Sequence, residues 1–425
     1  MRVSLKSLVS IALFVIIYSG FQGGRYFASN RLQEVGILLA MALFVYGAIM
    51  SSLTIKDKDL RWNWWILATI IFIAYTFVLP AQRFAVNADV EFLPSLFASR
   101  EFLMAMLCPA LYFLYRLGYD VEVIEKVFTV TLVMLIVSYL FHYFRIDLKS
   151  YYFSSNHALS GLVTYDPWRG YRLKTPSFAI FLFSILAPLM VVYVTGFFKK
   201  LLWLLLFGLV LYIWSLAMVR SMLAAIIFGI IFYYFFFATK FRIGLLLLVL
   251  PTLAVTVGWS VRSTLIYLSK QDPETDGVRY KSFMIAWNSF LETPFFGFGQ
   301  QSFYTLTEQQ LFWYKFYSSD IGLIGILFKY GAVGALVYIA FSIFLLKRMI
   351  TTNWAFRKFY NRNNPVLVSL LIIYLAFTIN IMLIPVFTYI PGITAASFGI
   401  ALSSIWQHKI ARDLAVQNKP RTALP

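Results

Sequence analysis

The chain has one cysteine, three histidines and few charged residues, and each shortage excludes a class of protein. A single cysteine, Cys108, rules out a disulfide within the chain. With only His142, His157 and His408 beside it, no metal-ligand spacing exists, although an ion held by carboxylates stays open. Only 13% of the residues are charged, whereas a soluble domain has about a quarter. The composition is therefore that of a membrane protein.

Apolar and aromatic residues make up most of the chain. Hydrophobic residues reach 61%, with 43 Phe and 27 Tyr, as expected where rings contact lipid or its interfaces. The formal net charge is +18. In a soluble protein this excess would suggest nucleic acid as a partner. In a membrane protein it is better explained by basic cytoplasmic loops and by a site for a phosphorylated lipid, so we expect membrane lipid and no nucleic acid as partners.

Apolar stretches of spanning length recur along the chain, with charged segments between them. Lipid cannot solvate unpaired backbone groups, so each stretch is expected to be a helix. The first has no cleavage site behind it and is interpreted as an uncleaved helix. The sequence predicts an all-α, polytopic membrane protein of about 12 transmembrane helices, near residues 5–20, 35–54, 63–80, 101–116, 127–144, 176–196, 200–218, 221–238, 243–258, 320–346, 366–384 and 389–406.

Lys and Arg are concentrated in the short loops on the side of both termini, most clearly between Lys347 and Arg362. The positive-inside rule then places both termini in the cytoplasm and two long loops on the opposite side. The chain is accordingly divided into N-terminal transmembrane helices (1–144), a first long loop (145–175), central transmembrane helices (176–258), a second, larger loop (259–318), and C-terminal transmembrane helices with a cytoplasmic tail (319–425).

Both long loops are rich in aromatic and charged residues together, which makes them too hydrophobic to be disordered. We expect folded caps that contain short amphipathic helices. In the second loop, apolar residues recur at helical spacing from Tyr280 to Leu291, with Arg279 and Lys281 among them. This pattern predicts an amphipathic helix on the membrane surface. Tyr165, Trp168, Tyr171 and Trp287 suit anchoring at the membrane interface.

Ionisable residues beside or inside apolar spans are the strongest functional candidates, because burying them in lipid is costly. Arg220 lies between two apolar stretches, where it is either a snorkelling side chain or a ligand-binding one. Asp320 precedes the tenth predicted helix, where it is either a helix cap or a catalytic carboxylate. Gly297 and Gly299 after Pro294 predict a tight turn that lets backbone approach a ligand, although most such pairs are only turns.

In combination these residues resemble a known family. The segment from Arg279 through Trp287 to Pro294, Gly297 and Gly299 is similar to the R…W…P-x-x-G-x-G segment of the bacterial O-antigen ligase and polymerase superfamily. In that family the segment occupies a large periplasmic loop in the C-terminal third.

Two further stretches extend the resemblance over roughly residues 205–345. Asp320 followed by Gly331-x-x-Gly334 resembles the family's helix after the loop, and Arg220 followed by Ser221 resembles one of its helix starts. The ligases carry a histidine where this chain has Asp320. The departure favours an O-antigen polymerase of the Wzy type.

The resemblance implies a cofactor-free, metal-independent glycosyltransferase of the bacterial inner membrane. It would pass a glycan from undecaprenyl diphosphate to the acceptor sugar of another lipid-linked repeat unit at the periplasmic face. One alternative is an O-antigen ligase that transfers glycan to lipid A-core. A second is a lipid-linked oligosaccharide flippase, against which the lack of two related halves argues. A chain-length regulator and a flippase are expected partners.

Roles are assigned to named residues under this interpretation. Arg220 and Arg279 would hold the diphosphate, because guanidinium groups bind phosphate oxygens in bidentate fashion. Asp320 would act as the general base. The predicted substrate-binding residues are Arg169, Arg172, His157, Lys281, Trp287, Gly297 and Gly299. The rings of Tyr165, Trp168, Tyr171 and Trp287 would stack on sugar faces, although interface anchoring explains them equally well.

Overall fold

The computed structural model describes residues 5–27, 31–54, 71–166, 170–217, 227, 229–231, 233, 274–300, 308–314, 316–318, 321–379 and 388–417. This part of the chain is almost entirely helical, which confirms the predicted all-α class. It also contains a two-stranded antiparallel sheet in the first long loop that the sequence did not predict.

The elements follow one another along the chain as 3-10, π and α-helices with a single hairpin among the described residues. They are α1 (Leu5–Gly20), η1 (Gly23–Phe27), α2 (Arg31–Thr54), η2 (Ala74–Val78), α4 (Leu79–Asn87), α5 (Phe92–Ala98), η3 (Arg100–Met106), α6 (Leu107–Arg116), α7 (Val121–Arg145), α8 (Leu148–Tyr152), α9 (His157–Ser160), β1 (Val163–Asp166), β2 (Gly170–Leu173), α10 (Ser177–Tyr193), α11 (Phe197–Ala217), α14 (Glu274–Glu292), α15 (Glu308–Leu311), α16 (Gly322–Tyr360), α17 (Pro365–Ile379) and α18 (Ile390–Gln417).

Four of the described helices are long and apolar enough to cross a membrane: α2, α7, α11 and α16. Three shorter apolar helices, α1, α10 and α17, accompany them. On α11, side chains such as Phe197, Phe198 and Leu205 are more than half exposed, as expected for a helix that faces lipid. The chain is therefore a multi-pass membrane protein.

Most predicted spans coincide with a described helix. The third is described only from residue 71, and the eighth and ninth lie almost wholly outside the described residues, so the count of 12 stays a prediction. One boundary was wrong: residues 347–360, expected in a loop, continue α16. Lys and Arg are good helix formers, so a basic segment can continue a helix. The Arg348 guanidinium in this extension donates to the Ser404 hydroxyl at 2.7 Å on the neighbouring α18.

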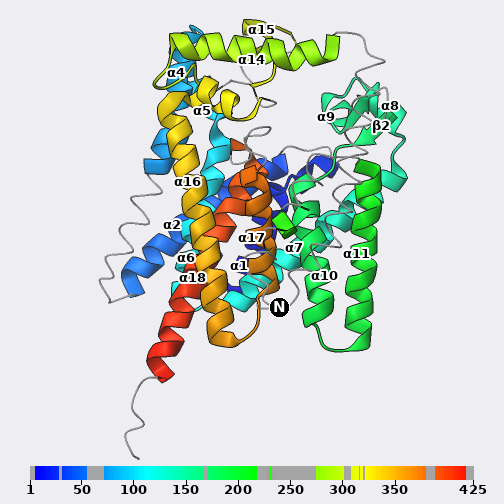
Figure 1. Ribbon diagram of the computed structural model, residues 1–425, viewed down its shortest axis with the longest axis vertical. Helices are drawn as coiled ribbons and strands as arrows, with labels where there is room; N and C mark the ends of the chain where they lie inside the picture. The colour runs from blue at the N-terminus through cyan, green and yellow to red at the C-terminus, as the bar shows by residue number, and fades with distance from the viewer. Residues whose placement is uncertain are drawn as a thin grey trace, which may run out of the picture.

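The core is built around α17, which is apolar on all sides and buried on all sides. Leu367, Leu370 and Ile373 are fully buried, as the pattern of such a helix requires. It packs against α10 and α16, and Figure 1 shows it near the centre of the molecule.

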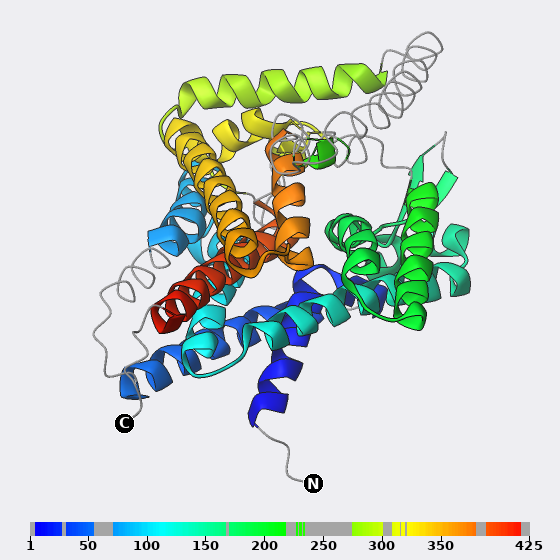
Figure 2. The same cartoon turned by 60° about the horizontal axis from the view of Figure 1, so that its bottom comes forward.

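Both described parts of the long loops lie at one end of the helix bundle. In Figure 1, α14 and the α8–β2 segment occupy this end, which we call the loop end, while the links from α10 to α11 and from α16 to α17 lie at the opposite end. Figure 2 turns that opposite end toward the viewer. The two long loops therefore share one side, as the alternation of spans predicts. Which side faces the periplasm stays a prediction.

Candidate functional site

The 293–300 loop, which carries Gly297 and Gly299, packs on a break in α16. Gly331 interrupts the helix with φ 66° and ψ −170°, so the carbonyls before it lose their helical donors. The amide of Phe298 donates to the Phe328 carbonyl at 2.7 Å, and the amide of Gly299 donates to the Lys329 carbonyl at 3.1 Å. Loop and helix thus share backbone hydrogen bonds across the break.

The pairing continues on the far side of the break. There the amide of Ala332 donates to the Pro294 carbonyl at 2.8 Å, and the amide of Val333 donates to the Phe295 carbonyl at 3.2 Å. The Asn87 amide group of α4 donates to the Phe298 carbonyl at 2.8 Å. The loop is therefore fixed to two helices.

The glycines of the P-x-x-G-x-G pattern are required by this packing. A Cβ on Gly297 would lie 2.5 Å from the Gly331 nitrogen, and one on Gly299 would lie 2.2 Å from the Phe84 nitrogen. Both glycines also have positive φ. Close backbone packing accounts for them without a ligand, and their predicted contact with substrate stays a prediction.

The predicted amphipathic helix is α14, which crosses the loop end of α16 (Figure 1). Its small residues Ser282, Ala286 and Ser289 are buried, and Ala286 packs in a cluster with Phe316 and Phe328. The opposite face exposes an apolar stripe of Tyr280, Phe283, Met284, Trp287 and Leu291.

The two predicted substrate-binding residues on α14 contact aromatic neighbours. The Lys281 ammonium lies 4.3 Å from the centre of the Trp313 ring, which is a cation–π contact. The Trp287 ring lies 5.5 Å from that of Phe290 and is about one-third exposed. Both side chains remain accessible from outside the bundle.

The hairpin of the first long loop has two chemically different faces. Tyr165 pairs with Tyr171 and their rings lie 4.8 Å apart, with the Tyr152 ring of α8 5.3 Å from that of Tyr171. On the other face Thr164 pairs with Arg172, and both line a pocket. Alternation along the strands separates the aromatic face from the polar one.

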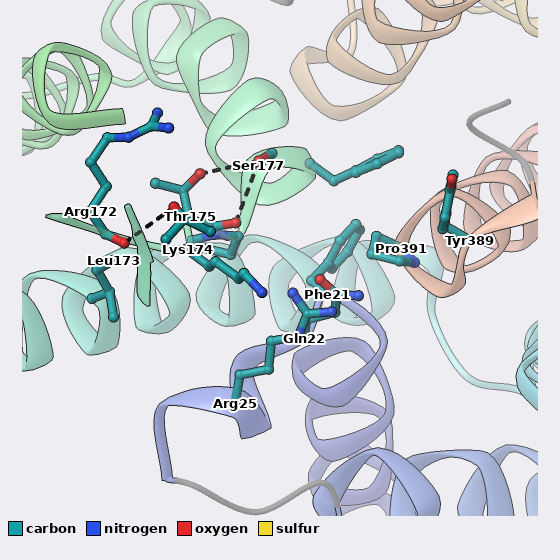
Figure 3. A pocket seen from close by; sticks show the side chains of 13 residues that line it. Phe21, Gln22, Arg25, Arg172, Leu173, Lys174, Thr175, Ser177, Tyr389 and Pro391 are labelled. Atoms are coloured by element: carbon teal, nitrogen blue, oxygen red, sulfur yellow. Dashed lines mark hydrogen bonds between the residues drawn. The ribbon is translucent and has the colours of Figure 1, made fainter. Parts of the chain in front are cut away.

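The pocket has a cavity volume of about 390 Å³, within the range of small-molecule sites. Four parts of the chain meet there at the loop end: the segment after α1, the hairpin with the residues behind it, the start of α10 and the start of α18 (Figure 3). Its lining residues are Phe21, Gln22, Arg25, Thr164, Arg172, Leu173, Lys174, Thr175, Pro176, Ser177, Phe178, Tyr389 and Pro391. We call it the basic pocket, because three of these residues are cations and none is acidic.

Two of the cations converge. Figure 3 shows the side chains of Arg25 and Lys174 pointing toward one another, whereas the guanidinium of Arg172 extends away from both. Burial lowers the pKa of the Arg25 guanidinium. Burial and the nearby Arg25 charge lower the pKa of the Lys174 ammonium. The Glu101 carboxylate acts on the Arg25 charge, but it does not line the pocket and accepts a hydrogen bond from Gln33.

A buried tyrosine links the two segments that carry Arg25 and Lys174. The Tyr26 hydroxyl, next to Arg25 in sequence, donates to the Lys174 carbonyl at 3.0 Å, and the amide of Lys174 donates to the Leu162 carbonyl at 2.8 Å. The backbone of both cations is thereby fixed. Arg25 is half-buried and Lys174 is exposed. Because two positive charges face each other with no carboxylate among the lining residues, an anion between them would be stabilised.

Further donors surround the same space. α10 begins at Ser177 with no side-chain cap, so the positive end of its dipole lies at the pocket wall. The hydroxyls of Thr175 and Ser177 lie 3.1 Å apart beside it. The polar part of the wall thus contains cations and hydroxyl donors and no carboxylate, which suits a tetrahedral oxyanion such as phosphate.

The predicted site residues are described to different extents. Asp320, Arg220 and Arg169 lie outside the described residues. Arg279 lies in α14 and His157 in α9, but their side chains are outside the described part. Of the predicted residues with described side chains, Arg172 alone lines the basic pocket.

Arg25 and Lys174 were not predicted from the sequence. The sequence did contain one signal for them, since each is a cation close to the end of an apolar span. Arg25 follows the first predicted helix, and Lys174 precedes the sixth. Such cations are common at span ends, where snorkelling explains them. Only the folded chain shows that these two meet.

No group of three His, Cys, Asp or Glu side chains that could hold a metal ion occurs among the described residues. Comparison with protein families gives one finding: residues 201–339 match the family described as O-antigen ligase. This confirms, over that segment, the resemblance to the O-antigen ligase and polymerase superfamily. No curated protein matches the chain.

Proposed function

We propose that this chain, which carries an O-antigen ligase family segment at residues 201–339, is a polysaccharide polymerase of the bacterial inner membrane. It would transfer a glycan from undecaprenyl diphosphate to the acceptor sugar of another lipid-linked repeat unit at the periplasmic face. The observation that carries the proposal is the family match. Arg220, Arg279 and Asp320, the three residues assigned to catalysis, all fall within the matched segment.

The proposed chemistry is a displacement at the anomeric carbon. The bond between this carbon and the diphosphate oxygen breaks, and a bond to the acceptor hydroxyl oxygen forms. Arg220 and Arg279 stabilise the negative charge that develops on the leaving diphosphate. Asp320 takes the proton of the acceptor hydroxyl as the new bond forms. Undecaprenyl diphosphate is released, and the proposed reaction requires no metal or cofactor.

An O-antigen ligase is the second candidate, because the matched family is described by that activity. The chain has no histidine between residues 201 and 339, where the resemblance places the ligase histidine. We therefore favour the polymerase.

The test is to incubate the purified full-length protein with lipid-linked repeat units and to separate the products by size. A polymerase produces a ladder of lengthened lipid-linked glycans. A ligase leaves the repeat units unchanged until lipid A-core is added, and a flippase never lengthens them. Unchanged repeat units without lipid A-core would overturn the polymerase assignment.

A further inference from the structure

The basic pocket is separate in sequence from the segment that carries the proposed chemistry. Every residue that lines it lies outside residues 201–339. Its walls come from the chain behind α1, from the first long loop and from the start of α18, whereas Arg220, Arg279 and Asp320 all lie within the matched segment. The pocket therefore adds cations to which the family match assigns no role.

The residues of the pocket define the chemistry of its ligand. A guanidinium offers a planar pair of donors and an ammonium a compact charge, and both bind phosphate oxygens. Arg25 and Lys174 supply one of each, and the hydroxyls of Thr175 and Ser177 add donors beside them. A phosphate or diphosphate has several acceptor oxygens and offsets both charges.

The position of the pocket favours a ligand attached to lipid. It lies beyond the last residue of α1 and at the first residues of α10 and α18, and α1 and α10 are apolar helices. Phe21, Phe178 and Pro391 form an apolar part of its wall. A phosphate at this level can carry an isoprenoid chain into the apolar region and a glycan into the aqueous one.

We infer that the basic pocket binds the phosphate groups of a second lipid-linked substrate, the acceptor, through Arg25 and Lys174. This inference rests on the proposed function, since a transfer between two lipid-linked glycans needs a place for two diphosphates. The donor diphosphate belongs to Arg220 and Arg279, and the acceptor diphosphate to the basic pocket.

The first test measures binding to the full-length protein in detergent, with farnesyl diphosphate as a soluble polyprenyl probe. The wild type is expected to bind it at two sites. Arg25→Gln and Lys174→Gln should each weaken one of these sites by at least about tenfold, because each removes a charge-assisted contact. Lys149→Gln, an exposed lysine of α8 outside the pocket, is the control and should leave both sites unchanged.

Competition distinguishes the possible sources of the phosphate. Inorganic diphosphate or phosphatidylglycerol should displace farnesyl diphosphate from this site only weakly. Displacement by inorganic diphosphate at equal concentration would make the pocket a free-anion site, and equal displacement by phosphatidylglycerol would make it a general phospholipid site. Either result overturns the acceptor assignment, as does unchanged binding in both pocket variants.

The second test separates this inference from the proposed function. Transfer from a lipid-linked donor is measured to a lipid-linked acceptor and to a soluble acceptor glycan without phosphate. The pocket variants should raise the KM for the lipid-linked acceptor at least about tenfold and leave transfer to the soluble acceptor unchanged. Equal loss with both acceptors would overturn the inference. No transfer by the wild type would instead overturn the proposed function, whatever the binding test shows.

Discussion

Asp320 is the residue for which a structural and a catalytic role differ most in their consequences. The described part of α16 begins at Gly322, with Ile321 as its N-cap. Asp320 lies outside the described residues, so the cap and the catalytic base both stay predictions. The family match includes this position, and under the proposed function Asp320 is the general base.

Replacement of Asp320 by asparagine is expected to abolish most of the activity without unfolding the protein. A general base lost in this way lowers turnover by roughly 10²–10⁴-fold. If Asp320 only interacted with the helix dipole, the same change would cost about 0.3–1 kcal/mol of stability. Polymer ladders made by membranes with matched protein levels measure the difference. A near-normal ladder from Asp320→Asn would leave the base unidentified.

At the scale of elements, the break in α16 is stabilised by backbone hydrogen bonds to the 293–300 loop. Four backbone hydrogen bonds cross between the two segments around Gly331. A Cβ on Gly331 would lie 2.3 Å from the Phe295 carbonyl oxygen. The φ and ψ angles of Gly331 lie in a region that essentially only glycine adopts. The loop and the break therefore form one unit that positions α14.

Gly331→Ala is expected to destabilise the protein by more than about 1–3 kcal/mol, the usual cost of such backbone strain, because the new Cβ also collides with the loop. The midpoint of thermal unfolding in detergent should fall clearly. Gly208→Ala is the matched control: Gly208 lies within α11, and nothing lies within 4 Å of its added Cβ. Equal midpoints for the two variants would show that the break is not structurally required.

At the scale of the whole molecule, the described parts of both long loops lie at one end of the helix bundle, in agreement with the expectation from apolar run lengths and loop charges. Those signals are local, so they also predicted α14. The break at Gly331 and the meeting of Arg25 with Lys174 depend on contacts between segments far apart in the chain. No spacing in the sequence encodes such contacts, which is why these two features were missed. The hairpin joins neighbouring segments, but its strands of four residues are too short to show a clear alternation.

Orientation in the membrane can be tested by cysteine labelling, since Cys108 is the single native cysteine and is buried. In a Cys108→Ala background, Lys149→Cys in the first long loop should react with a membrane-impermeant thiol reagent in spheroplasts, where the outer membrane no longer shields the periplasmic face. Arg362→Cys, between α16 and α17, should react only after the inner membrane is permeabilised. Both positions are exposed. Equal labelling of the two would contradict the proposed orientation and the periplasmic site.

The walls of the basic pocket come from segments far apart in the chain, and this fixes when the pocket exists during synthesis. Arg25 emerges from the ribosome directly after α1, whereas Tyr389 and Pro391 emerge with the start of α18. A nascent chain that has inserted the described helices before α18 still has one side of the pocket open. The two cations thus acquire their complete surroundings only after α18 has been synthesised, so a nascent chain that ends before α18 would not capture lipid-linked glycan there.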